Sequence, residues 1–192
     1  MTLAVNLLPG LPPYGPTAVP FPADWGRTGR EGTVVEFMTG GESWVANFQP
    51  GIAGIQLAEL HPNGRDAVVV VSGDLWAVDV ASRSAQQLLP AIDSAFPVDN
   101  PPGWVFTRQG LALARFGAAG ILWHTKRLSL DGFGRVRIEG DRISGVAWTG
   151  IDDQWVPFEV ELASGRSWGG GFSDDDIERW ERIARGAGGG AG

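Results

Sequence analysis

Histidine side chains are the groups in this chain best suited to proton transfer or metal binding. The 192 residues include two of them, His61 and His124. An imidazole titrates near neutral pH and binds metals through either ring nitrogen. His61 stands in a His-Pro-Asn-Gly turn, His124 follows Trp123 in an apolar run, and neither has a carboxylate at ligand spacing. We therefore predict no metal site, no catalytic residue and no cofactor, and we assign both histidines to hydrogen bonding.

Glutamates offer a second chemistry, because paired carboxylates act as acid and base in hydrolytic enzymes. Glu36 is the most informative, since it interrupts the apolar run 34–37. An inward-facing glutamate there would need a polar partner, whereas simple alternation along a strand turns it outward. No spacing brings it together with Glu31, Glu159 or Glu161. The sequence therefore defines no acid–base pair.

Other charged clusters have structural explanations. Asp152-Asp153 and the run 174–176 lack the ligand spacing of an EF-hand loop, so we interpret them as a solvated turn and a helix N-terminus. Arg30 could contribute to an anion site. Its stretch 29–32 (Gly-Arg-Glu-Gly) nevertheless lacks the strand, Gly-rich turn and helix of a phosphate loop.

Nine tryptophans are the compositional peculiarity of the chain. Spread at about one per predicted strand, they are best explained as side chains that fill the gaps between twisted sheets. We expect Trp168 to be exposed, because glycines 169–171 follow it. An exposed indole could stack on sugar rings or on a partner peptide. The candidate ligand-binding residues, which combine aromatic, acidic, basic and imidazole chemistry, are Trp168, Trp44, Glu36, Arg30 and His124.

The formal net charge of -7 argues against a nucleic-acid partner, which would require clustered Lys and Arg. Cysteine is absent, so disulfides, zinc-thiolate sites and cysteine nucleophiles are excluded. No apolar run approaches the roughly 20 residues that span a bilayer, and the N-terminus lacks the features of a secretory signal. We expect a cytoplasmic protein whose partner is another protein, and the oligomeric state stays open.

Strand and turn patterns predict an all-β fold of antiparallel meanders. The clearest stretch, 66–89, contains three β-branched or alternating runs joined by Gly, Ser and Asp turns. The predicted strands are 33–38, 42–48, 51–60, 67–72, 75–81, 85–89, 94–98, 104–107, 111–116, 121–128, 135–139, 142–149, 155–163 and 166–168.

The chain is predicted to have three parts. Six prolines within residues 1–32 indicate an extended arm packed on the fold. Residues 33–186 form a single β-domain that ends in a helix over 174–186, which Ser173 and Asp176 cap. Residues 187–192 form a disordered Gly-rich tail.

The segment Trp76-Ala-Val-Asp79, flanked by Ser-Gly and small-residue turns, resembles a blade of the quinoprotein or WD-type β-propellers. Residues 158–167 echo this pattern about two blade lengths later, at roughly 40 to 50 residues per blade. The chain lacks the Trp-Asp and Gly-His signatures of WD blades. Residues Gly145 to Gly165 are also similar to a segment of small uncharacterised bacterial proteins. Neither resemblance implies an activity, and a two-sheet sandwich or a single curled sheet is the alternative to a propeller-like fold.

We predict a non-catalytic protein-interaction or binding module. The alternative is a carbohydrate-binding or hydrolytic protein with an aromatic and carboxylate cleft, and an orphan inhibitor of a toxin is a third possibility. A concave surface with an exposed tryptophan and two carboxylates within about 10 Å would favour the hydrolytic alternative.

Overall fold

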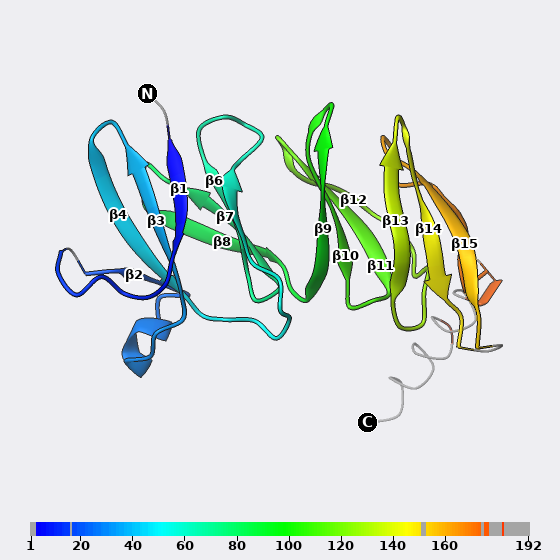
Figure 1. Ribbon diagram of the computed structural model, residues 1–192, viewed down its shortest axis with the longest axis horizontal. Coiled ribbons are helices and arrows are strands. Elements are labelled where there is room, and N and C mark those ends of the chain that lie inside the picture. Colours follow the sequence, from blue (N-terminus) through cyan, green and yellow to red (C-terminus); the bar gives the residue numbers. More distant parts are fainter. Residues whose placement is uncertain (1–2, 16, 151–152, 174, 177–181, 183–192) are drawn as a thin grey trace. The chain divides into compact units, whose positions relative to one another are not determined.

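The computed structural model describes residues 3–15, 17–150, 153–173, 175–176 and 182. The chain divides into two compact units, residues 1–108 with 116–122 and residues 109–115 with 123–192. It forms four four-stranded sheets, here called sheets A to D, whose strands except β5 and β16 are labelled in Figure 1. All strand pairs with a given register are antiparallel except β2–β4.

Sheet A has the order β1-β3-β4-β2. Its central hairpin turns at Gly40 and Gly41, whose φ angles of 62° and 91° fit a turn that requires positive φ at both central residues. The Pro-rich N-terminal segment supplies both outer strands and the 3-10 helix η1 (Trp25–Thr28). The strands are β1 (Ala4–Leu8), β2 (Val19–Phe21), β3 (Thr33–Thr39) and β4 (Glu42–Phe48).

Sheet B is a simple meander in the order β5-β6-β7-β8. It confirms the three strands predicted within 66–89, including the tight turn at Ser72 and Gly73, whose φ angles are 46° and 90°. The strands are β5 (Leu57–Leu60), β6 (Ala67–Val71), β7 (Asp74–Asp79) and β8 (Ser84–Leu89).

A hydrophobic core joins sheets A and B. Trp76 of β7 packs on Phe48 with ring centroids 5.5 Å apart, and Phe48 stacks on Phe21 at 5.2 Å. The alternate side chains of β6, Val69 and Val71, are fully buried in the same cluster. Each large apolar side chain buried here contributes about 1.5–3 kcal/mol.

Sheet C has the order β12-β11-β10-β9. Pro97 lies in β9, an outer strand, where a missing N–H is tolerated. The strand predicted over 121–128 ends at His124. Beyond it, the Thr125 N–H donates to the Leu113 carbonyl and the Leu128 N–H donates to the Leu111 carbonyl, so the regular strand pairing does not continue. The strands are β9 (Ile92–Asp99), β10 (Pro102–Arg108), β11 (Ala112–Gly117) and β12 (Gly120–His124).

Sheet D has the order β13-β14-β15-β16. A bulge between Gly134 and Arg137, with Arg135 at φ 54°, shifts the register of β13. One face is buried through Ile143, Phe158 and Val160. The strands are β13 (Phe133–Glu139), β14 (Arg142–Trp148), β15 (Trp155–Glu161) and β16 (Ser167–Gly169).

The all-β prediction is confirmed, but the chain forms four sheets rather than the two of a sandwich or one curled sheet. Residues 49–56, 90–91 and 125–132 connect each sheet to the next and contain no strand. The single-domain and arm boundaries stay predictions.

The helix predicted over 174–186 falls mostly outside the described residues, as does the tail 187–192. The predicted cap is present, because the Ser173 N–H donates to the Asp176 carboxylate at 3.0 Å and the Asp176 N–H donates to Ser173 Oγ at 3.2 Å. Residues 175, 176 and 182 have helical backbone conformation, and the rest of the predicted span lies outside the described residues. Within the described part of the chain, no helix has the length and apolar character needed to cross a membrane.

Candidate functional site

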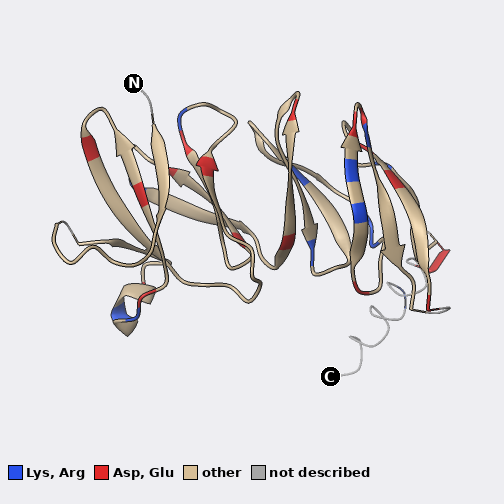
Figure 2. Cartoon of the chain, in the orientation of Figure 1, with Lys and Arg blue, Asp and Glu red and all other residues tan. Residues whose placement is uncertain are grey.

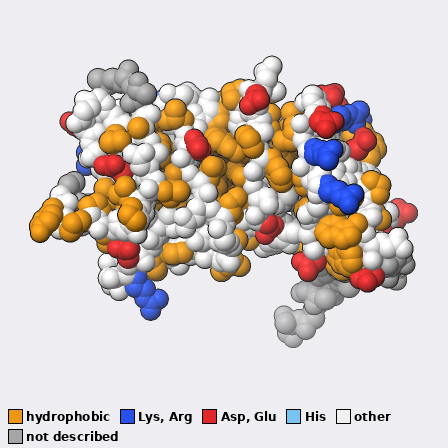
Figure 3. All heavy atoms as spheres, viewed as in Figure 1, with side chains coloured by type: hydrophobic (Ala, Val, Ile, Leu, Met, Phe, Trp, Pro, Cys, Tyr) orange, Lys and Arg blue, Asp and Glu red, His pale blue; other side chains and the backbone are white. Residues whose placement is uncertain are grey.

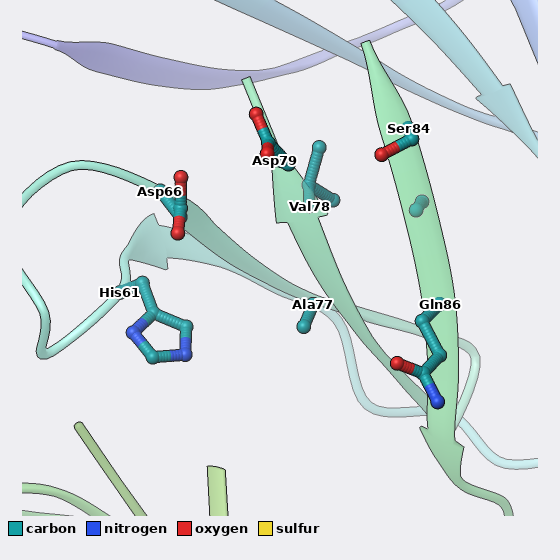
Figure 4. Close-up of a pocket in the computed structure, with 8 residues that line it drawn as sticks. His61, Asp66, Ala77, Val78, Asp79, Ser84 and Gln86 are labelled. Carbon is teal, nitrogen blue, oxygen red and sulfur yellow. The ribbon is translucent and has the colours of Figure 1, made fainter. Parts of the chain in front are cut away.

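A pocket of about 250 Å³ lies on sheet B beside the hairpin of β7 and β8. The loop between β5 and β6 supplies one side of it, and the hairpin supplies the other, as Figure 4 shows. The polar and small residues that line it include His61, Asp66, Ala77, Asp79, Ser84 and Gln86.

The loop 61–66 is held by its own hydrogen bonds. The His61 N–H donates to the Asp66 carbonyl at 2.8 Å, which closes the loop. Asn63 Oδ1 accepts from the N–H groups of Arg65 and Asp66, both at 3.1 Å, and Asn63 Nδ2 donates to Asp66 Oδ2 at 2.7 Å. Gly64 takes φ 76°, so the turn predicted from Pro-Asn-Gly is confirmed. His61 and Asp66 are thus positioned by short-range bonds.

His61 is 7% exposed, and its ring meets Phe116 edge-on with centroids 4.9 Å apart. Burial lowers the pKa of the imidazole and outweighs the opposing field of Asp66. Nδ1 accepts a hydrogen bond from the Asn63 N–H at 3.1 Å, so the neutral ring carries its proton on Nε2. At neutral pH the ring is therefore an uncharged N–H donor.

Two carboxylates lie at the pocket. The Ser82 N–H donates to Asp79 Oδ1 at 2.9 Å, and this bond is the main reason that the pKa of Asp79 lies below its usual value. Asp79 is therefore ionised and anchors the β7–β8 turn. Asp66 is partly neutralised by Arg65, whose Nε lies 3.1 Å from Oδ2.

Strand β8 is the outer strand of sheet B. Its sequence, Ser-Ala-Gln-Gln-Leu-Leu, contains no proline and no charged residue, the two devices that commonly protect sheet edges. Gln86 lies opposite Ala77 on the pocket face, and Gln87 lies opposite Trp76 on the other face. Both glutamines are exposed. The pocket thus adjoins an unprotected strand edge.

The candidate residues in the first unit do not form this site. Trp44 is buried and stacks on Phe37 with centroids 4.5 Å apart, so it belongs to the core rather than to a ligand surface. Glu36 is half-buried and pairs with Val45, which places it on the sheet face opposite to Trp44. Arg30 is exposed, and its carbonyl accepts a bond from Asn47 Nδ2 at 3.0 Å.

The other two candidates lie in the second unit, on different sheets. Trp168 of β16 is 42% exposed, which confirms the expected exposure, and the guanidinium of Arg142 lies 5.0 Å from its ring centre. His124 ends β12 and is exposed. Trp155, at 50%, is more exposed than Trp168 and was not singled out from sequence. The alternation of 155, 157, 159 and 161 along one strand face is the signal that would have identified it.

The hydrolytic alternative requires a hollow that contains an exposed tryptophan and two carboxylates, and the hollow at Trp168 does not meet this requirement. Glu159 lies directly opposite Trp168, and Glu161 is two residues further along the same face of β15. The hollow beside Trp168 is lined by Lys126 and residues 167–173 and includes neither glutamate. In the described part of the chain, no three His, Asp or Glu side chains gather closely enough to hold a metal ion.

The chain is an all-β protein of four-stranded sheets with a polar pocket beside the outer strand of sheet B. No family model matches it, and no curated protein sequence matches it. Eight chains of solved structures match it. One is the crystal structure of TolB from Acinetobacter baumannii, with 16% sequence identity and a TM-score of 0.38 over 71% of this chain and 36% of that chain. The chain thus matches about a third of the length of TolB.

Proposed function

We propose that this protein is a non-catalytic interaction module that binds an extended segment of another protein along the outer edge of β8. The observation that carries the proposal is the coincidence of an unprotected outer strand with the His61 pocket beside it. An added strand pairs its backbone N–H and C=O groups with those of the sheet edge, whereas pockets select its side chains. Sheet B offers both requirements in one place.

The chemistry of the pocket indicates the kind of segment. The carboxylates of Asp79 and Asp66 make the rim acidic, and the chain as a whole carries a net charge of -7. Opposite charge accelerates encounter and disfavours wrong partners. His61 Nε2–H and the Gln86 amide supply neutral hydrogen-bonding groups. We therefore assign the partner a strand-forming segment with a lysine or arginine.

Selection from a displayed library of random peptides with the immobilised full chain tests this proposal. We expect basic peptides rich in β-branched residues to be enriched. The substitution Gln86→Lys places a positive charge on the pocket face and should weaken binding of a selected peptide about tenfold, since like-charge contacts cost several kcal/mol. Gln87→Lys makes the same change on the opposite face of β8 and serves as the matched control.

The expected pattern is a loss with Gln86→Lys and a change of less than about twofold with Gln87→Lys. Equal sensitivity to both substitutions would show a general charge effect rather than recognition at the pocket. Enrichment of acidic peptides would contradict the assigned partner chemistry.

We also infer that the four sheets are blade-like units. Sheets B, C and D each run up and down through four strands in chain order, the organisation of a propeller blade. A crystal structure with the four sheets arranged around a common axis is the expected result. The cytoplasmic location stays a prediction from sequence.

A further inference from the structure

Sheet D has one outward face that is rich in aromatic and polar side chains. Along β15, Trp155, Pro157 and Glu159 point to this face and are exposed. Their partners on β14 are Trp148, Val146 and Ser144. The face therefore runs from an aromatic end to a polar one.

The aromatic end is a pair of indoles. The Trp148 and Trp155 rings have centroids 5.2 Å apart and are inclined by 59°. The Trp155 ring extends across β14 to the beginning of β13. A methyl group added at Gly134 would lie 3.6 Å from its Cζ3 atom, and one added at Gly132 would lie 3.8 Å from its Cη2 atom. The glycines let the indole lie on the backbone, and half of Trp155 stays exposed to solvent.

A second indole lies at the polar end. Trp168 is directly opposite Glu159, four residues along β15 from Trp155, or about 13 Å at the usual rise of a strand. Arg142 contacts both of these residues. Its Nη1 atom lies 3.7 Å from Glu159 Oε2, and its guanidinium lies over the Trp168 ring. The hydrogen-bonding groups of Arg142 and Glu159 thus lie beside Trp168, and the apolar pair Pro157 and Val146 separates them from Trp155.

The charges on this sheet are balanced. Figure 2 shows Lys and Arg along β13, and Figure 3 shows hydrophobic side chains next to them on the visible face. The exposed or partly exposed charged residues of the sheet strands are three basic and three acidic: Arg135, Arg137, Arg142, Glu139, Glu159 and Glu161. In a chain of net charge -7, this local neutrality opposes both a polyanion and a strongly basic ligand.

We propose that this face binds an uncharged polysaccharide. A pyranose ring has an apolar C–H face that matches an exposed indole, and its rim of hydroxyls both donates and accepts hydrogen bonds. Arginine supplies donors only and glutamate supplies acceptors only, so their alternation suits hydroxyls, which are both. Indoles offer a large contact area with little conformational freedom to lose. This site is independent of β8, since it lies in the other unit and takes a different class of ligand.

Affinity electrophoresis of the full chain through gels containing hydroxyethylcellulose, xylan, amylose or galactomannan tests the proposal. We expect at least one of these four neutral polysaccharides to retard the protein. Trp155→Ala should weaken that retardation at least about tenfold, and Trp155→Phe should restore part of it. Tyr14→Ala is the matched control, because Tyr14 is a 90% exposed aromatic in the other unit.

Thermal unfolding of each variant shows whether it is folded, so a loss of binding with an unchanged Tm is assigned to the surface. Migration unaffected by all four polysaccharides overturns the proposal. Retardation that survives Trp155→Ala also overturns it. Binding of an acidic proline-rich peptide in place of the polysaccharides would identify the face as a peptide site.

Discussion

Nδ1 of His61 accepts a hydrogen bond from the backbone N–H of Asn63 across 3.1 Å. This bond fixes the tautomer of a ring that is buried against Phe116 and directs the Nε2 proton away from the loop. A single short-range turn therefore determines the hydrogen-bonding character of the pocket. Burial of the same ring lowers its pKa and makes the pocket sensitive to pH.

The stability of the fold should fall as the pH drops below about 6.5, the pKa of an unfolded histidine. Burial holds the pKa of His61 below that value, so the unfolded state binds the proton first. The unfolding free energy then decreases with falling pH until the folded ring is also protonated, and it is unaffected by His61 at higher pH. Measurement of Tm between about pH 5 and 8 in wild type and His61→Asn checks this.

The variant should show a shallower decrease, because asparagine keeps an acceptor near the Nδ1 position but does not titrate. If His61→Asn and wild type have parallel profiles, His61 is not the responsible group.

Loss of the Asp79 carboxylate should destabilise the β7–β8 turn. The pKa of Asp79 is lowered in the fold, so its contribution is present above the unfolded pKa of about 3.9 and is lost as the pH falls through the folded pKa. Asp79→Asn should lower Tm by a few degrees at pH 7 and by progressively less as the pH is lowered below about 3.9. Asp24→Asn is the control, since Asp24 makes no side-chain cap bond to η1. Equal effects of the two substitutions would contradict the assigned role.

A glycine at position 165 is required by the indole of Trp123. Gly165 has φ 73°, and an added Cβ would lie 2.7 Å from the Cδ2 atom of Trp123. Gly140 also has a positive φ, 60°, but an added Cβ meets no atom within 4 Å. Gly140→Ala should cost about 1–2 kcal/mol from backbone conformation alone, and Gly165→Ala should cost about 1–3 kcal/mol more. Urea denaturation measures both, and similar values would exclude the clash.

Local features of the fold were predictable from sequence, but the candidate site was not. The run Val68 to Val71 and the Ser72-Gly73 turn carry their structure in neighbouring residues, and they form as predicted. The position of His61 and Gln86 on two sides of one pocket instead depends on the register of β6, β7 and β8, which periodicity does not specify.

The misassigned candidate Trp44 has the same explanation. The sequence around a single tryptophan in a strand does not distinguish a ligand-binding side chain from a core side chain. Pairing of β3 with β4 places Trp44 opposite Phe37, and the stacking of the two rings makes Trp44 a core residue. Trp155 shows the reverse case, because alternation along β15 turns it outward, and Gly134 of β13 with Gly132 just before that strand leaves room for its ring.

Two tryptophans should respond differently to replacement by phenylalanine. Trp123 Nε1 donates to the Leu162 carbonyl at 2.9 Å, whereas Trp44 Nε1 is buried with no hydrogen-bond partner among the described residues. Trp123→Phe removes a net-stabilising bond of about 0.5–1.5 kcal/mol. Trp44→Phe loses ring volume but also relieves a buried donor, whose desolvation costs about 1–3 kcal/mol. We expect a larger fall in the unfolding free energy for Trp123→Phe, measured by urea denaturation. A larger fall for Trp44→Phe would show that packing against Phe37 outweighs the unpaired indole N–H.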